Sequence, residues 1–345
     1  MHNKTQILFI CKKRNDFYGP SFGLINSCRF ISNELEEHGI HSKVISVNDN
    51  NDIDREVTKY RPTHVFIEAL WVVPNKFEEL IPLHPKVQWH VRIHSKIPFL
   101  ANEGNAINWL REYDKLSQLY PTLHIAANSP DVVETFKCDY NIEMEYFPNI
   151  YHPEEYTFDD IFENFHEVGH KEGHNIINIG CFGAIRPLKN HLNQAMAAIG
   201  FGNRINHKIH FHINSDRCEQ KGDNVLNNLI YTFKNTPHKL VMHPWMEHQD
   251  FIKVVKKMDI GLQVSLSETF NIVAADFAWN EIPLVGSDEI SWLDRKYKAD
   301  PNSIENIIDK LNFAYLGKKH DIQKSNRENL EKYNKKSIKI WINSI

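Results

Sequence analysis

Residues 265–287 contain the residue types expected of a site that binds a phosphate and a sugar. Their sequence, SLSETFNIVAADFAWNEIPLVGS, follows an apolar run and continues at helical spacing. We expect a helix to begin near Thr269, where the first backbone N–H groups have no partner within the helix and attract an anion. Glu268 precedes these groups and could accept hydrogen bonds from sugar hydroxyls, and Asp276 follows on about the same helix face. The amides concerned belong to Thr269, Phe270, Asn271 and Ile272.

A second segment, FGAIRPLKN at residues 182–190, is a candidate diphosphate clamp. Gly183 follows an apolar run, and Arg186 and Lys189 precede another stretch with helical spacing. Cationic side chains at such a loop could neutralise the charge that builds up on a leaving phosphate. Taken alone, both segments also have purely structural interpretations, with Glu268 as a helix cap and residues 182–190 as a solvated loop.

The elements that must position these residues follow from the apolar pattern. Short apolar runs alternate with helical patterns in both halves of the chain, which predicts two α/β domains with doubly wound parallel sheets. The expected strands of the first domain are residues 6–11, 43–47, 64–67, 87–93, 123–127 and 142–146. Those of the second domain are 176–181, 208–213, 239–242, 260–264 and 282–285.

The pattern divides the chain into four parts. We expect a first domain at 1–150, a linker at 151–173, a second domain at 174–322, and a final helix at 323–345. Parallel sheets bind ligands beyond the carboxyl ends of their strands. Two such domains facing a cleft could therefore hold one substrate each.

The two segments resemble a known family, the retaining GT-B glycosyltransferases with the E-x7-E motif (the family 4-like, or group 1, glycosyltransferases). Glu268 matches the first Glu of that motif, and Asp276 falls on the second, which in the family binds the nucleotide ribose. Residues 182–190 are similar to the family pattern G-R-L-x-x-x-K-G, with Gly183 and Lys189 in place and Arg186 two residues beyond the family's Arg. The resemblance implies the GT-B fold, with two Rossmann-like domains.

The first domain carries weaker similarities to the same family. Gly19 and Gly23 resemble its glycine loop, which approaches the donor phosphate and the acceptor. His94 ends an expected strand where the family often has a histidine that contacts the donor sugar, although a hydrogen-bonded strand-end histidine is equally consistent. Trp245 lies where the family holds the nucleotide base, and it could stack on a base or pack internally. The family's C-terminal helix crosses back to brace the first domain.

The resemblance implies an enzyme that transfers a hexosyl or pentosyl group from a nucleotide-diphosphate sugar to an acceptor hydroxyl, with retention of anomeric configuration. Lys189, Arg186 and the amides after Glu268 would stabilise the departing diphosphate, Glu268 and His94 would hold the sugar, and Asp276 the ribose. No side-chain base, metal ion or cofactor is implied. The acceptor would be a glycan, a small molecule or modified DNA.

Composition narrows these expectations further. The formal net charge of −4 does not indicate a dedicated nucleic-acid-binding protein. The five cysteines are scattered without a CxxC pair, which favours a reduced, cytoplasmic protein. The composition, rich in Asn, Lys and Ile, would suit an AT-rich bacterial or viral genome, so we expect the cytoplasm of a bacterium or of an infected host cell. No apolar run is long enough to span a membrane.

Several alternatives stay open. A GT-B sugar-nucleotide epimerase, a non-catalytic binding module, and a viral transferase acting on hydroxymethylated DNA bases through basic residues 12–14 would share the same fold. His166 and His170 match the HExxH pattern of zinc hydrolases, and His174 adds a third histidine, but glycines interrupt this polar segment. Asp52 and Asp54 match a DxD motif in a polar connection, where a structural role is expected.

Overall fold

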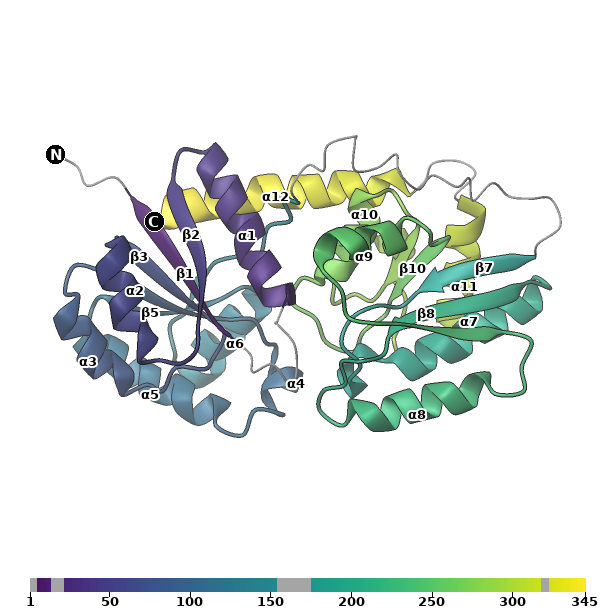
Figure 1. Ribbon diagram of the computed structural model, residues 1–345, viewed down its shortest axis with the longest axis horizontal. Coiled ribbons are helices and arrows are strands. Elements are labelled where there is room, and N and C mark those ends of the chain that lie inside the picture. The colour runs from purple at the N-terminus through teal and green to yellow at the C-terminus, as the bar shows by residue number, and fades with distance from the viewer. Residues whose placement is uncertain (1–4, 14–21, 154–174, 318–322) are drawn as a thin grey trace. The chain divides into compact units, whose positions relative to one another are not determined.

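The computed structural model describes residues 5–13, 22–153, 175–317 and 323–345 of the 345-residue chain. The chain divides into two compact units, which we describe separately. Unit 1 comprises Met1–His152 and Tyr333–Ile345, and unit 2 comprises Pro153–Lys332. Each unit contains its own parallel sheet (Figure 1).

The unit 1 sheet has six parallel strands in the order β2-β1-β3-β4-β5-β6. The strands are β1 (Gln6–Lys12), β2 (His41–Val47), β3 (His64–Glu68), β4 (Gln88–Ile93), β5 (Leu123–Ala127) and β6 (Glu145–Tyr146). The strand order reverses between β1 and β3, because β2 lies on one side of β1 and the later strands lie on the other. The carboxyl ends of these strands are therefore the expected ligand edge of unit 1.

Helices cover both faces of the unit 1 sheet (Figure 1). One face packs on α2 (Asp52–Tyr60), α3 (Lys76–Leu83), α5 (Ala106–Leu119) and α6 (Pro130–Tyr140). The other packs on α1 (Phe22–Glu37) and on the final part of α12 (Lys324–Ser344), and α4 (Ile97–Leu100) follows β4. Alternate residues of each strand point to opposite faces. Phe9 and Phe66 consequently meet Trp341 of α12, while Trp89 meets Phe77 of α3.

The unit 2 sheet has five parallel strands in the order β11-β10-β7-β8-β9. They are β7 (Ile176–Gly180), β8 (Lys208–Asn214), β9 (Lys239–His243), β10 (Ile260–Gln263) and β11 (Leu284–Gly286). The connecting helices are α7 (His191–Arg204), α8 (Gly222–Phe233), α9 (His248–Val255), α10 (Ile272–Trp279) and α11 (Ile304–Gly317), with short 3-10 turns η3 (Pro187–Lys189) and η4 (Arg295–Tyr297). Figure 1 shows α7 and α8 on one side of this sheet and α9 and α10 on the other.

Gly261 allows α10 to pack directly on β10. A Cβ atom at this glycine would lie 2.5 Å from the Phe277 ring of α10, which is closer than real atoms approach. The absent side chain therefore sets the distance between the helix and the strand that carry much of the candidate site.

The expectation of two doubly wound α/β domains is confirmed. Among the described helices, none combines the length and the apolar character that a membrane span requires.

Candidate functional site

The two candidate segments meet at the point where the strand order of the unit 2 sheet reverses. β7 and β10 are neighbours, and the chain continues from β7 to one side of the sheet and from β10 to the other. Gly183 and Lys189 follow β7, and Glu268 follows β10. The Leu266 N–H donates to the Leu188 carbonyl at 2.9 Å, which joins the two loops. A reversal of this kind is where open parallel sheets bind their ligands.

Lys189 and Glu268 form a direct ion pair at this position. The Lys189 ammonium donates to Glu268 Oε1, although the residues are 79 positions apart in the sequence. Their side chains are only 11% and 8% exposed, so the pair is largely shielded from solvent. Gly183 lies beside it with φ +116°, and a Cβ there would be 3.9 Å from Lys189 Cε. The structure thus brings Gly183, Lys189 and Glu268 together.

Asn271 holds the Glu268 carboxylate in place. Its Nδ2 donates to Glu268 Oε1 at 3.2 Å and to Gln263 Oε1 at 3.0 Å. The Glu268 N–H in turn donates to Glu289 Oε2 at 3.2 Å. Glu268 Oε1 therefore accepts hydrogen bonds from both Lys189 and Asn271. Because Lys189 follows β7 and Asn271 follows β10, residues of both loops fix the position of the carboxylate.

Two amide side chains brace the Lys189 loop, and neither was predicted from the sequence. Asn190 donates to the carbonyls of Val264 and Pro301, at 3.1 and 2.8 Å. Gln194 donates to the Lys189 carbonyl and accepts from the Val264 N–H, each at 2.7 Å. Neither belongs to a chemical motif, so the only signal was an amide residue just after the clamp and another on the following helix.

The helix after Glu268 begins later than the sequence predicted. Asn271, with φ +62°, is the N-cap of α10, and its Oδ1 accepts from the Ala274 N–H at 2.9 Å. Thr269 and Phe270 therefore lie in the preceding loop rather than in the first turn of a helix. Phe270 is buried, and its carbonyl accepts from Trp292 Nε1 at 3.0 Å. Of the four predicted amides, only that of Ile272 lies in the helix itself.

Asp276 lies in α10 and is bonded to a residue of a neighbouring helix. It is 1% exposed, and its carboxylate accepts a hydrogen bond from His248 Nε2 of α9 at 2.7 Å. A ribose at this position would meet the Asp276–His248 pair rather than the carboxylate alone. His248 is a site neighbour that the sequence did not reveal, because no motif links α9 to α10.

Arg186 forms an ion pair of its own. Its Nη1 donates to Glu219 Oε2 at 3.2 Å, and the other Glu219 oxygen accepts from Arg217 at 2.7 and 2.9 Å. The two cations of the predicted clamp are thus in separate ion pairs, Lys189 with Glu268 and Arg186 with Glu219. A contact between Arg186 and a phosphate requires a rearrangement of its pair with Glu219.

Trp245 lies after β9 and is half-buried. Its backbone N–H donates to Asp216 Oδ1 at 2.7 Å. The Arg217 guanidinium lies over its ring, 4.6 Å from the ring centroid. Within the described residues, its indole Nε1 is buried without a hydrogen-bond partner. The Arg217 guanidinium therefore covers one face of the Trp245 ring.

A buried histidine lies beside the clamp. His191 follows Asn190 directly and is 1% exposed. Burial, followed by the charges of Lys189 and Arg186, lowers the pKa of His191 to about 3. Burial is the larger cause, and the two cations add to it.

The remaining expected residues belong to the first domain or to the linker. His94 follows β4 in unit 1, hydrogen-bonded to Glu68. Gly23 lies in the first turn of α1 rather than in a loop, and Gly19 lies outside the described residues. The histidines of the HExxH pattern, His166, His170 and His174, also lie outside them.

Other potential metal ligands are already bonded to one another. Asp52 and Asp54 belong to α2, where Asp54 accepts from His84 at 2.7 Å. Among the described residues, Glu34, Glu37 and His152 are the one group of three such ligands whose donor atoms lie within 4.8 Å of one another. His152 Nδ1 is bonded there to Glu34 Oε2 at 2.7 Å.

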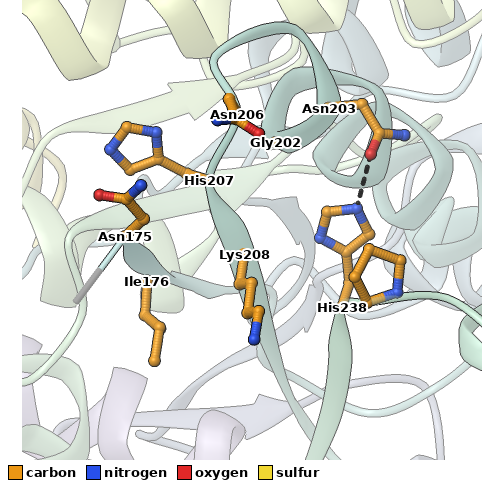
Figure 2. Close-up of a pocket in the computed structure, with 9 residues that line it drawn as sticks. Asn175, Ile176, Gly202, Asn203, Asn206, His207, Lys208 and His238 are labelled. Atoms are coloured by element: carbon orange, nitrogen blue, oxygen red, sulfur yellow. Dashed lines mark hydrogen bonds between the residues drawn. The ribbon is translucent and has the colours of Figure 1, made fainter. Parts of the chain in front are cut away.

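A cavity of about 410 Å³ lies at the opposite edge of the unit 2 sheet (Figure 2). Asn175, Ile176 and Lys208 line it from the amino ends of β7 and β8, together with Asn203 and His238, which hydrogen bond to each other. Because parallel sheets bind substrates at the carboxyl edge, we do not assign this cavity to the candidate site.

Comparison with solved structures identifies the fold. A sucrose-phosphate synthase from Thermosynechococcus elongatus superposes with a TM-score of 0.67 at 10% identity, covering 94% of each chain. The E. coli trehalose-6-phosphate protein bound with UDP-2-fluoro glucose gives 0.63 at 11% identity over 96% of each chain. A glycosyltransferase from Rickettsia africae gives 0.59 at 14% identity, covering 99% of this chain and 100% of that one.

No protein-family model and no curated protein sequence matches the chain. The structural neighbours nevertheless cover nearly its whole length and include both domains. The chain therefore has the GT-B fold of these glycosyltransferases, as the resemblance of its sequence implied.

Proposed function

We propose that the protein is a glycosyltransferase that moves a sugar from a nucleotide-diphosphate sugar to an acceptor hydroxyl, with retention of anomeric configuration. The observation that carries this proposal is the Lys189–Glu268 pair, which lies beside Gly183 where the unit 2 strand order reverses. These are the residues that match the family's clamp and its first motif glutamate.

In this proposal, the donor replaces the direct contact between Lys189 and Glu268. The Lys189 ammonium turns to the diphosphate and stabilises the negative charge that develops as the sugar leaves. Glu268, still held by Asn271, accepts hydrogen bonds from sugar hydroxyls. The ion pair thus keeps both side chains oriented before the donor binds, which lowers the cost of ordering them.

The rest of the nucleotide would extend across unit 2. The Asp276–His248 pair would meet the ribose, and Trp245 would contact the base. Arg186 would add a second positive charge if its pair with Glu219 opens. We propose a reaction without a metal cofactor, because the resemblance implies that protein cations neutralise the diphosphate.

A donor panel tests this proposal. The E. coli neighbour is bound with UDP-2-fluoro glucose, which supports starting with UDP-glucose and continuing with GDP- and ADP-sugars. We expect one nucleotide sugar to raise the Tm more than its free nucleotide does. Stabilisation by none of them would contradict the proposal.

The stereochemistry and acceptor need separate measurements. Incubation of the stabilising donor with candidate glycans and small molecules, followed by mass spectrometry, would identify the acceptor. An NMR spectrum of the early product then reports its anomeric configuration, and an inverted product would refute retention. Nothing in the comparisons supports modified DNA as the acceptor.

A further inference from the structure

The C-terminal half of α12 has two faces of different character. One face packs into unit 1, where Asn334, Ile338 and Trp341 are buried. Asn334 exchanges two hydrogen bonds with the backbone of Tyr151, at 2.7 and 3.0 Å. The outer face of this part of the helix is therefore held at a fixed place on unit 1.

That outer face carries a row of lysines. Lys335, Lys336 and Lys339 are exposed, and Lys332 is exposed one turn earlier on the same helix. Spacings of three and four residues place these side chains next to one another along a helix. We call these four residues the lysine row. No aspartate or glutamate occurs in residues 332–345, so no acidic side chain of this part of α12 interrupts the row.

Nothing in the described parts of the chain neutralises the lysine row, since none of its four members forms an ion pair there. Arg327, earlier on α12, is different, because it pairs with Glu331 at 3.2 Å and with Glu281 at 3.5 Å. Like charges three or four residues apart destabilise a helix. The row therefore opposes helix formation and needs another explanation.

The helix dipole does not supply that explanation. Cations stabilise a helix within its last turn, and their effect falls off beyond it. The last turn of α12, which ends at Ser344, contains no basic residue. Solubility does not require a row of one sign either, because a surface of mixed charges is soluble. A partner with negative charge is the explanation that remains.

The chemistry of the row favours a lipid surface as that partner. Clusters of four or more basic residues on one helix are typical of binding to anionic phospholipids. Ile342, three residues after Lys339, is 37% exposed. An apolar side chain gains from entering the boundary between headgroups and acyl chains, and it gains nothing from a phosphodiester backbone. The row also contains no arginine, the residue preferred for nucleic-acid recognition.

We propose that the lysine row is a docking surface for a membrane that contains anionic phospholipids, with Ile342 entering the headgroup region. The contact is peripheral and reversible, because it depends on charges that salt screens. It goes beyond the proposed function and does not rest on it. The candidate donor site follows β7 and β10 of unit 2, so docking through α12 requires no nucleotide sugar.

Vesicle binding tests this proposal on the full chain. Vesicles of phosphatidylcholine and phosphatidylglycerol in equal parts are compared with vesicles of phosphatidylcholine alone, and bound protein is measured by sedimentation. We expect binding to the anionic vesicles only, and its loss at about 1 M salt, where the Debye length is about 3 Å. Equal binding to both kinds of vesicle, or binding to neither, would overturn the proposal.

A triple variant tests the lysine row itself. Each lysine near an anionic surface strengthens binding about fivefold, so Lys335→Gln, Lys336→Gln and Lys339→Gln together should weaken partitioning to the vesicles about 100-fold. These side chains are exposed, so the fold should be kept, which circular dichroism checks. Partitioning equal to that of the wild type would show that the row is not the docking surface.

The matched control removes three charges from other parts of unit 1. Lys59, Lys86 and Lys115 are likewise exposed and, among the residues described, form no ion pair. Their combined substitution by glutamine changes the net charge by the same amount and should leave vesicle binding close to that of the wild type. Equal weakening in the two triple variants would assign the binding to net charge and refute the row.

Duplex DNA separates the membrane from a nucleic acid. We expect DNA at the same salt concentration to compete poorly with the anionic vesicles. Tighter binding to DNA than to the vesicles, lost in the Lys335/Lys336/Lys339 variant, would assign the row to a nucleic acid and overturn the proposal. Because every readout is binding, the outcome does not depend on which donor the protein uses.

Discussion

At the residue scale, the most informative feature is that candidate site residues are bonded to one another or to close neighbours. Lys189 bonds to Glu268, Asp276 to His248, and Arg186 to Glu219. In each pair a carboxylate accepts a hydrogen bond, so it can be shielded from solvent without losing its hydrogen-bond partner. A substrate that replaces these partners needs groups of matching charge, and a diphosphate with an attached sugar offers both an anion and hydroxyl donors.

Substitution of Lys189 tests the clamp. We expect Lys189→Ala to lower kcat about 100- to 1,000-fold, the range for loss of one group that stabilises charge in a transition state. The measurement is steady-state turnover of the stabilising donor, with folding checked by circular dichroism. Lys253→Ala is the control, because Lys253 also pairs with a carboxylate of unit 2, Asp250, but lies exposed on α9. Similar kinetics for the two variants would contradict the assignment.

At the element scale, the C-terminal helix α12 contributes a key part of the unit 1 core. Trp341 is 0% exposed, and its ring lies 4.6 Å from Phe147 and 4.9 Å from Phe66, centroid to centroid. Its indole N–H donates to the Pro148 carbonyl at 2.8 Å. The part of α12 from Tyr333 onward therefore belongs to unit 1, together with the first 152 residues.

Removal of the Trp341 side chain should destabilise the protein strongly. We expect Trp341→Ala to reduce the free energy of unfolding by about 3–5 kcal/mol, because it leaves a large cavity and an unpaired carbonyl. Ile342→Ala, at the next and 37% exposed position, should cost less than about 1 kcal/mol. Urea titrations followed by fluorescence compare them, and equal midpoints would show that α12 is not needed for the unit 1 core.

At the scale of the whole molecule, buried histidines make stability depend on pH. Burial and the neighbouring His90 lower the pKa of His64 from 6.5 to about 4. Burial and His243 lower the pKa of His212 in the other unit to about 4 as well. Between pH 6.5 and 4 the unfolded chain binds protons that the folded chain excludes, so stability is retained above pH 6.5 and falls as the pH drops toward 4.

Acid titration of stability tests this linkage. We expect the free energy of unfolding to fall by about 2 kcal/mol for each of these histidines between pH 7 and pH 4. His64→Gln should make the fall shallower, since the variant lacks one of the protons concerned. His41→Gln is the control, because the His41 side chain is 49% exposed. If the free energy of unfolding falls equally steeply with pH in both variants, His64 does not contribute to the pH dependence.

The elements were largely predictable because each depends on a local pattern. The expected strand 123–127 coincides with β5, and the expected starts at 64, 176, 208 and 260 are those of β3, β7, β8 and β10. The helix start near Thr269 was wrong because Asn271 adopts a left-handed backbone and caps α10 with its own side chain. The backbone conformation of Asn271 moved the start of α10 to Ile272, and the spacing of apolar residues gives no sign of that conformation.

The sequence by itself determined the two α/β domains, because apolar periodicity is a property of the chain, and its resemblance to a family pattern marked residues 182–190 and Glu268 as parts of one candidate site. Only the tertiary structure decided which partners those residues have. Glu219 reaches Arg186, and Glu68 reaches His94, because the members of each pair lie at the carboxyl ends of neighbouring parallel strands, at one edge of a sheet. His248 reaches Asp276 because α9 and α10 pack against each other. Contacts between side chains so far apart in the sequence leave no local pattern to read.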